Sequence, residues 1–336
     1  MNILITSFVF VPRTGGIENS TLMLADELAR IGHQVTVVTK TMTNIENSYD
    51  FDVVRNPSFL TLLKLSLKAD ILFQNHPSLS LGLPGLFVRA ATVTLHQTWL
   101  SDGSRRAEIM SPIKRLFVSR SRNLVNSEAL GKKLGMQYQV LGNPYESRIF
   151  YRREVAKEKN AWIVVGRLIH DKGMDIAIRA LAEFSKTNQA VTLDIIGEGI
   201  EREKLAQLAE ELGVQEKVNF LGALRGEELA KEYSKHSIAI VPSRWEEPFG
   251  IVALEGLACG CRLVCARSGG LPEAAGKVAN FFEKNSVEGC LGAIREAMAL
   301  GDYSNEEWKL IEEHLKPYRK ENYIQSLCSI FNQVKK

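Results

Sequence analysis

The segment Glu247-Pro-Phe-Gly-Ile-Val-Ala-Leu-Glu255 carries two carboxylates eight residues apart, with a proline and a glycine soon after the first. It follows the apolar run 237–241, which predicts a buried strand. Pro248 suits the first turn of a helix, so we expect a helix over 249–259 with both carboxylates on one of its faces. A buried strand followed by a helix is typical of a parallel α/β sheet.

The start of this expected helix is suited to bind an anion. The backbone N–H groups of Phe249, Gly250 and Ile251 would have no partner within the helix, and such groups bind phosphates. Carboxylates beside a phosphate site can hold the hydroxyls of a sugar, so the segment predicts a nucleotide-sugar site. The spacing alone is equally compatible with a surface helix whose two glutamates face water.

Strand and helix patterns alternate along the whole chain, which predicts two doubly wound parallel sheets, one in each half. A polar, charged stretch near 143–160 separates the halves, as linkers do. The tail 304–336 has a helical pattern with a break at Pro317. We expect strands at 2–6, 34–39, 70–74, 92–95, 122–126, 137–141, 161–166, 191–196, 217–221, 237–241 and 262–265, and further helices at 18–31, 105–120, 173–187, 200–212, 226–234 and 286–299.

The bulk properties are those of a soluble globular protein. The chain has 336 residues, enough for two domains, and a net charge of +3. It has no apolar run of roughly 18 residues and no basic leader before its first strand, so we expect neither a transmembrane helix nor a signal peptide. Five cysteines, an odd number, fit a reducing cytoplasm. Cys259, Cys261 and Cys265 are close in sequence, but no fourth ligand lies at zinc spacing, so we expect no metal there.

Basic residues concentrate in one part of the first half, 105–133, where apolar residues lie between them partly at helical spacing. A basic amphipathic helix can lie on an anionic membrane surface. The same pattern fits a helix that packs its apolar stripe on the sheet, or a patch that binds an acidic acceptor. The eight basic residues, opposed by Glu108 and Glu128 only, are Arg105, Arg106, Lys114, Arg115, Arg120, Arg122, Lys132 and Lys133.

Two cations follow the first strand of the second half. Arg167 ends the run Val164-Val-Gly-Arg167, and Lys172 precedes a glycine that opens the next helix. Both would lie at the carboxyl end of a parallel strand, where such sheets bind ligands. Arginine can bind a diphosphate with two N–H groups and lysine acts as a point charge. The alternatives are two surface cations, or neutralisation of one of them by Asp171.

Further residues lie at the expected carboxyl ends of strands. Gly15 and Gly16 would let a ligand approach the backbone at a helix start, although a tight turn with positive φ explains them as well. His96 ends a strand of the first half, where a histidine is more often structural. Gly197 follows a strand of the second half and could line a nucleotide pocket or simply form a turn.

The order and spacing of these motifs, which span nearly the whole chain, resemble those of the retaining glycosyltransferases of family 4, which have the GT-B fold. The resemblance implies two Rossmann-like domains that face a cleft. These are an N-terminal acceptor-binding domain (1–150), a C-terminal domain that binds a nucleotide-sugar donor (151–316), and a C-terminal helix (317–336) that packs back on the first domain.

The resemblance also implies roles for individual residues. Arg167 and Lys172 would bind the donor diphosphate and stabilise the leaving nucleotide in place of a metal ion, so that no cofactor is needed. Glu247 and His96 would contact the transferred sugar, and Glu255 the ribose. The residues that would line the rest of the donor site are Gly15, Gly16, Gly197, Leu224, Phe249, Gly250 and Ile251. In the family an aspartate usually follows the histidine, whereas Gln97 follows here, which puts a histidine–carboxylate pair in doubt.

The function expected from these features is transfer of a hexosyl-type sugar to a glycan or a lipid-linked acceptor, in the synthesis of a surface polysaccharide or lipopolysaccharide. The protein would be cytoplasmic, and peripheral on the inner face of the membrane if 105–133 binds lipid. Neither the donor nucleotide (UDP, GDP or ADP) nor the acceptor follows from the sequence. Rival interpretations are a nucleotide-sugar epimerase of the same fold, a non-catalytic nucleotide-binding scaffold, and a nicotinamide-dependent oxidoreductase.

Overall fold

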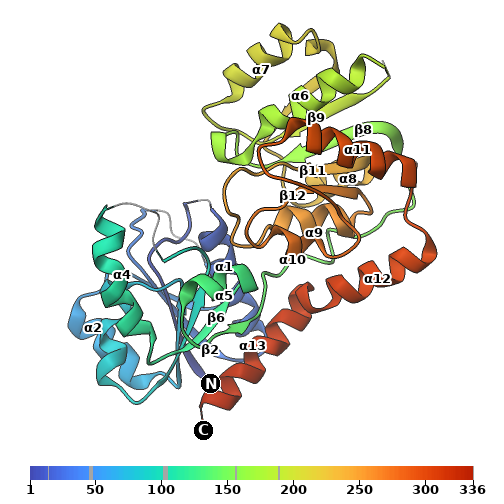
Figure 1. Ribbon diagram of the computed structural model, residues 1–336. Coiled ribbons are helices and arrows are strands. Elements are labelled where there is room, and N and C mark those ends of the chain that lie inside the picture. Colours follow the sequence, from blue (N-terminus) through green and yellow to red (C-terminus); the bar gives the residue numbers. More distant parts are fainter. Residues whose placement is uncertain (14, 45–47, 101–104, 156, 188–189, 336) are drawn as a thin grey trace. The chain divides into compact units, whose positions relative to one another are not determined.

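A computed structural model describes all residues of the chain except 14, 45–47, 101–104, 156, 188–189 and 336; the side chains of 105–111 and 159 are likewise outside the description. The chain forms two compact units, each described here by itself (Figure 1). The first unit comprises Met1–Gly142 together with Glu321–Lys336, and the second comprises Asn143–Lys320. The second unit is closed near its two ends by a bridge that pairs Tyr145 with Arg319.

The first unit is built on a seven-stranded sheet of order β3-β2-β1-β4-β5-β6-β7, in which every neighbouring pair is parallel. The order grows outward from β1 in one direction and from β4 in the other, which is the doubly wound arrangement. The strands are β1 (Asn2–Ser7), β2 (Gln34–Thr39), β3 (Asp52–Arg55), β4 (Ile71–Asn75), β5 (Ala91–His96), β6 (Arg122–Val125) and β7 (Gln139–Val140).

Helices cover both faces of this sheet, as a parallel sheet buried on both faces requires. The largest core cluster of the unit joins Ile5 and Phe73 of the strands to Leu24 of α1 and to Leu327 and Phe331 of the C-terminal helix α13. The helices are α1 (Gly16–Arg30), α2 (Phe59–Lys68), α3 (Leu79–Gly82), the 3₁₀ helix η1 (Leu83–Phe87), α4 (Arg105–Val118), α5 (Glu128–Leu134) and α13 (Lys320–Val334).

The second unit repeats the design with a six-stranded parallel sheet of order β10-β9-β8-β11-β12-β13. Two apolar clusters lie on its two faces, one centred on Trp162 and α6, the other on Leu254 and α9. Its strands are β8 (Glu158–Val165), β9 (Thr192–Ile196), β10 (Val218–Gly222), β11 (His236–Val241), β12 (Arg262–Ala266) and β13 (Asn280–Phe282).

The helices of the second unit connect these parallel strands. They are η2 (His170–Lys172), α6 (Met174–Ser185), α7 (Arg202–Glu211), η3 (Gln215–Lys217), α8 (Gly226–Lys235), α9 (Ile251–Ala258), α10 (Leu271–Ala275), α11 (Val287–Leu300), α12 (Asn305–Leu315) and η4 (Lys316–Tyr318). The predicted class, two doubly wound parallel sheets, is confirmed. The sequence patterns missed the short edge strands β3 and β13, whose partly exposed residues give little periodic signal.

One prediction about the segment 247–255 is wrong. Helix α9 begins at Ile251, so Glu247 and Pro248 lie in the preceding loop and the two glutamates do not share a helix face. The reason is Gly250, which has a φ of +120° that a helix cannot contain. A Cβ atom at Gly250 would lie 2.4 Å from the Leu271 side chain, so this close packing also requires glycine.

Candidate active site

The candidate residues of the second unit follow the carboxyl ends of its parallel strands. Arg167 comes two residues after β8, Gly197 directly after β9, and Glu247 in the loop between β11 and α9. Because the carboxyl ends of parallel strands meet at one edge of a sheet, these loops share an edge. The structure therefore gathers at that edge residues that are up to 80 positions apart in sequence (167 to 247).

Lys172 and Glu247 form the central contact of this edge. The Lys172 ammonium lies 2.5 Å from Glu247 Oε1, and the Ser243 hydroxyl donates a second hydrogen bond of 2.7 Å to the same oxygen. Glu247 is buried, and Lys172 keeps part of its side chain accessible. A buried carboxylate with two donors is held in one orientation, and its charge is offset by the lysine. The alternative that Asp171 neutralises Lys172 does not hold, because Lys172 pairs with Glu247.

Arg167 differs from Lys172 in having no partner for its guanidinium among the described residues. Its side chain is exposed, although its loop is held by backbone hydrogen bonds such as the one from Leu168 N–H to the Glu198 carbonyl. An exposed guanidinium on a fixed loop presents five N–H donors to an incoming anion without first breaking an ion pair.

The glycines of this edge are required by close approach of one loop to another. A Cβ at Gly197, where φ is +142°, would lie 1.8 Å from the Gly166 carbonyl oxygen. A Cβ at Gly269 would lie 2.1 Å from the Glu247 carbonyl oxygen. Real Cβ atoms do not come this close to backbone, so any side chain at these two positions would push the loops of the site apart.

The entrance of α9 offers backbone donors. The amides of Phe249, Gly250 and Ile251 donate to no other residue in the part of the chain that the structure describes. The Phe249 side chain does not face a ligand, because it is buried with its ring 5.3 Å from that of Tyr318. Leu224 packs against the same apolar cluster. The polar contribution of this segment is therefore its main chain.

Glu255 lies within α9 in a different environment from Glu247. Desolvation raises the pKa of its carboxyl group to about 8, so the group is mostly protonated at neutral pH. Its side chain accepts no hydrogen bond from the described residues, and it is partly accessible. A neutral carboxyl group can both donate and accept hydrogen bonds, which suits it to hydroxyl groups.

Sequence reasoning gave no role to two further residues of this edge. Ser243 hydrogen-bonds Glu247, as described above. Arg244 makes a bidentate ion pair with Asp175 at the start of α6, with N–O distances of 2.5 and 2.7 Å, and so fixes the loop after β11. The polar run between a buried strand and Glu247 was the available signal, because polar residues at a strand end need partners.

The corresponding edge of the first unit carries neutral polar groups instead of charges. His96 ends β5, and its Nε2–H donates to Asn123 Oδ1 at 2.9 Å. Burial lowers the pKa of His96 to about 4, which keeps the ring neutral, and its Nδ1 has no partner among the described residues. The ring therefore pairs with an amide, and Gln97 instead bonds Asn75 and Ser20.

His76 and Asn126 join this neutral edge and were given no role from the sequence. His76 follows β4 with a φ of +73°, a strained conformation for a residue other than glycine. Desolvation lowers its pKa to about 3, and its Nδ1 is buried without a described partner, as is the Asn126 side-chain oxygen. A positive φ and the burial of a polar atom cannot be read from a sequence, so neither feature was available to assign them a role.

A small pocket of about 270 Å³ lies next to His96. Its lining combines apolar side chains with two cations, and the Lys133 ammonium lies 4.4 Å from the centre of the Trp99 ring. Arg115 donates to the carbonyls of Leu134 and Lys133 at the end of α5. The lining residues are His96, Thr98, Trp99, Leu100, Arg115, Leu130, Lys133 and Leu134.

Gly15 and Gly16 begin α1, as expected for a helix start near a ligand. Gly15 is extended, with a φ of −178°, and Gly16 does not have a positive φ, so the alternative of a left-handed tight turn is wrong. A Cβ at Gly16 would have no atom within 4 Å. The space over this helix start is therefore open on the side where a Cβ would project.

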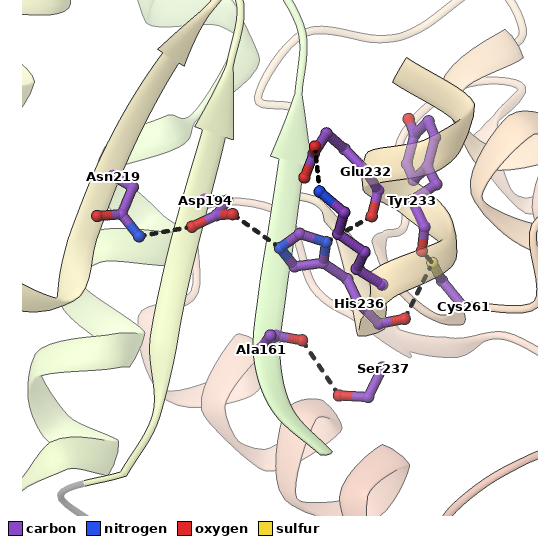
Figure 2. A network of polar contacts seen from close by, with 9 residues as sticks. Ala161, Asp194, Asn219, Glu232, Tyr233, His236, Ser237 and Cys261 are labelled. Atoms are coloured by element: carbon purple, nitrogen blue, oxygen red, sulfur yellow. Dashed lines mark hydrogen bonds and ion pairs between the residues drawn. The ribbon is translucent and has the colours of Figure 1, made fainter. Parts of the chain in front are cut away.

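Residues that could hold a metal ion lie elsewhere in the second unit. Ligand atoms of Asp194, Glu232 and His236 lie within 4.8 Å of one another (Figure 2). Both ring nitrogens of His236 lie at hydrogen-bond distance from oxygen atoms, 3.0 Å from Asp194 Oδ2 and 2.6 Å from the Glu232 carbonyl. Asn219 donates to the other Asp194 oxygen. Contacts within the chain thus occupy these ligand atoms, since the Glu232 carboxylate pairs with Lys235.

The cysteines also give no sign of a metal site within the described chain. Cys259, Cys261, Cys265 and Cys290 are buried free thiols, and burial raises the pKa of each. The basic segment 105–133 is only partly described, because the side chains of 105–111 lie outside the description. None of the described helices is long and apolar enough to span a membrane.

Comparison with known proteins identifies the class. Residues 147–313, about half of the chain and most of the second unit, match the family Glycosyl transferases group 1. The chain belongs to the group 1 glycosyltransferases, and its two parallel-sheet units are those of the GT-B fold. The narrower assignment to family 4 stays a prediction.

Individual relatives cover different shares of the chain. It is 27% identical to a GDP-mannose-dependent alpha-(1-6)-phosphatidylinositol monomannoside mannosyltransferase of Mycolicibacterium smegmatis, over 86% of this chain and 87% of that protein. An uncharacterized glycosyltransferase of Methanocaldococcus jannaschii is 39% identical over 38% of this chain, which spans only 33% of that relative's length. The structure of Anabaena HepE in complex with UDP has a TM-score of 0.80 at 16% identity, covering 99% of this chain and all of HepE.

Proposed function

We propose that this protein transfers a hexosyl-type sugar from a nucleotide diphosphate sugar to a glycan or lipid-linked acceptor, with retention of configuration at the anomeric carbon. The observation that carries the proposal is the cluster of Lys172, Glu247 and Ser243, together with the unpartnered Arg167 on the loop after β8 at the same edge of the sheet. It places two cations and a fixed carboxylate at the edge of a parallel sheet, where nucleotides bind in such folds. This is the arrangement that a sugar diphosphate needs.

Arg167 and Lys172 bind the donor diphosphate in this proposal. An ammonium group has three donors, so Lys172 can keep its bond to Glu247 while it reaches a phosphate oxygen. As the bond to the sugar breaks, negative charge grows on the leaving diphosphate, and two fixed cations stabilise that charge. They supply the electrostatic effect that a metal ion supplies in other transferases, and so we propose that no metal is needed.

Glu247 contacts the donor sugar and Glu255 contacts the ribose. The lysine and serine hold the Glu247 carboxylate, so it can accept hydrogen bonds from sugar hydroxyls without rotating. The carboxyl group of Glu255, protonated at neutral pH, offers both a donor and an acceptor to the ribose hydroxyls. The free amides of 249–251 add donors to sugar or phosphate oxygens, and Gly197 and Leu224 line the nucleotide.

The first unit supplies the acceptor side of the reaction. His96 presents Nδ1 as an acceptor, because its other nitrogen is committed to Asn123, and it would take a hydrogen bond from a sugar hydroxyl. Gly15 and Gly16 open the start of α1 to the diphosphate and the acceptor. The acceptor itself is proposed to be a lipid-linked surface glycan or lipopolysaccharide intermediate, reached from the cytoplasmic side of the membrane.

Two of the compared proteins support a nucleotide-sugar donor. The mycobacterial relative is named for GDP-mannose and a phosphatidylinositol mannoside, and HepE is described with UDP. These names leave the donor nucleotide open between GDP and UDP. Thermal unfolding with UDP, GDP and ADP would identify it, because a ligand that binds the native state raises the melting temperature by mass action.

The test of the catalytic roles is Lys172→Ala in the purified protein with the donor so identified. Loss of one transition-state cation should lower turnover by at least about 10²-fold. Lys186→Ala is a matched control, because Lys186 also lies beside α6 but pairs with the exposed Glu183. Near-normal turnover of the Lys172 variant would refute the assigned role, and equal loss in the control would attribute the effect to folding.

A further inference from the structure

The first unit exposes a group of large apolar side chains that its core does not use. Helix α2 packs Leu62 and Ser66 inward, while Leu60 and Leu67 point outward and are 68% and 64% exposed. The neighbouring 3₁₀ helix η1 exposes Leu86 and Phe87, the latter to 67%. Several large apolar side chains exposed on neighbouring elements are uncommon on a monomeric protein and indicate an interaction site.

These side chains belong to adjacent elements. Helix α2 packs against η1, and a Cβ at Gly82, directly before η1, would lie 2.5 Å from Phe117 of α4. Helix α4 in turn exposes Ile113 and Leu116. We call the outer faces of α2, η1 and the described end of α4 the α2–α4 surface; Figure 1 labels α2 and α4 in the first unit.

The charges on the α2–α4 surface have one sign. Lys64 and Lys68 alternate with Leu60 and Leu67 on the outer face of α2, because positions i, i+4, i+7 and i+8 share one side of a helix. Arg89 follows η1, and Arg120 follows α4.

Acidic residues are nearly absent from the same sequence. Asp70 is the only acid between positions 56 and 100, and there is none between 112 and 127. Asp70 is already engaged, by the Asn2 N–H and by Lys335. The surface therefore combines exposed apolar area with uncompensated positive charge.

We propose that the α2–α4 surface docks on an anionic lipid bilayer. Apolar side chains flanked by lysines suit the boundary between head groups and acyl chains, where leucines insert and lysine stems extend to the phosphates. A protein partner fits less well, because lysine is depleted from the cores of protein interfaces. The sequence predicted membrane contact through the basic segment 105–133, and that prediction stays untested; the present proposal rests on the exposed side chains of α2 and η1.

Docking here extends the proposed function, since a protein held at a bilayer meets lipid-linked acceptors. The two inferences are separable, because vesicle binding is measured without donor or acceptor. Donor binding is measured separately, as the rise in melting temperature that the nucleotide causes, and this measurement tests the proposed function alone.

The experiment is co-sedimentation of the full chain with vesicles of phosphatidylcholine containing phosphatidylglycerol, and with phosphatidylcholine alone. The wild type should bind the anionic vesicles, more weakly at high salt because screening reduces the electrostatic part. Leu60→Glu/Leu67→Glu should weaken binding at least about tenfold, since it removes two inserting side chains and adds two repelling charges. Lys64→Gln/Lys68→Gln should remove part of the salt-dependent binding.

Ile200→Glu is the matched control, because Ile200 is 92% exposed but lies in the second unit, outside the α2–α4 surface. It should bind vesicles as the wild type does. All altered positions are exposed, so circular dichroism and melting temperature should stay close to wild type. Failure of the wild type to sediment, or equal binding by the Leu60/Leu67 variant, would overturn the proposal. The proposal would also be overturned if light scattering showed that the wild type is a dimer without lipid and that the Leu60/Leu67 variant is a monomer. The α2–α4 surface would then be a dimer interface.

Discussion

The carboxyl edges of the two sheets use opposite electrostatics on the same architecture. In the second unit, Lys172 and Glu247 form a partly buried ion pair and Arg167 adds an unpartnered cation. In the first unit, His76 and His96 are neutral and present unpartnered nitrogens. A diphosphate carries fixed charge and needs cations, whereas an acceptor sugar presents hydroxyls and needs neutral hydrogen-bonding groups.

The two edges also differ in how tightly their loops are packed. At the second edge, glycine backbones touch other loops, as Gly197 touches Gly166. At the first edge, the space over Gly16 is open. A tightly packed edge keeps charged groups in place, which electrostatic catalysis requires. The family match lies in the second unit, which holds the tightly packed edge.

The largest expected effect is a difference in stability between two glycine-to-alanine variants, one at each edge. Gly197→Ala should destabilise the second unit by at least about 3 kcal/mol, because the new Cβ meets a backbone oxygen and the φ is unfavourable. Gly16→Ala should change stability by less than about 0.5 kcal/mol, because nothing lies near its Cβ. Urea unfolding followed by tryptophan fluorescence measures both. Similar losses would mean that the two edges are not packed differently.

A second prediction concerns Glu255 and the cost of its burial. Its folded-state pKa is about 8 and its usual value is 4.5, so the native state keeps a proton that the unfolded state loses. Stability therefore falls as pH rises from about 4.5 to 8. Glu255→Gln cannot ionise and should gain roughly 1–3 kcal/mol over wild type at pH 8, with little gain at pH 4.5. A stability difference that does not change with pH would contradict a carboxyl group that desolvation keeps protonated.

The smallest expected effect tests the neutral edge. The pKa of His96 falls from 6.5 to about 4 on folding, so the unfolded state binds a proton that the native state excludes. The neutral His96 ring therefore contributes fully to stability above pH 6.5, and this contribution is lost as pH falls toward 4. In the His96→Asn variant, the stability that the first unit loses on acidification to pH 5 should be smaller by about 1 kcal/mol. Hydrogen exchange of peptides from the first unit measures this difference. An unchanged pH profile would show that the ring is not neutral and buried.

Much of the fold could be predicted because its signals are local. Apolar, β-branched runs such as 92–95 and 237–241 predicted central strands, and they are strands buried in parallel sheets. The edge strands β3 and β13 were missed because an edge strand is half exposed and loses that signal. The helix start at Ile251 was placed two residues early, since Pro248 favours a helix start but Gly250 prevents one.

The candidate site could be predicted only as a set of residues. The positions of Arg167, Lys172, Glu247 and Glu255 after strands or in α9 followed from the alternating pattern. The pairing of Lys172 with Glu247, 75 positions apart, did not, and neither did the hydrogen bond from Ser243. The neutral states of His76 and His96 also depend on burial that no local pattern contains.

The sequence by itself determined the two parallel sheets and the edge of each sheet at which the candidate residues lie, because strand periodicity and polar residues at strand ends are local properties. The tertiary structure alone decided which charges meet, which carboxyl group keeps its proton, and which face of α2 stays outside the core. Those outcomes depend on distances between residues far apart in sequence and on the water excluded between them.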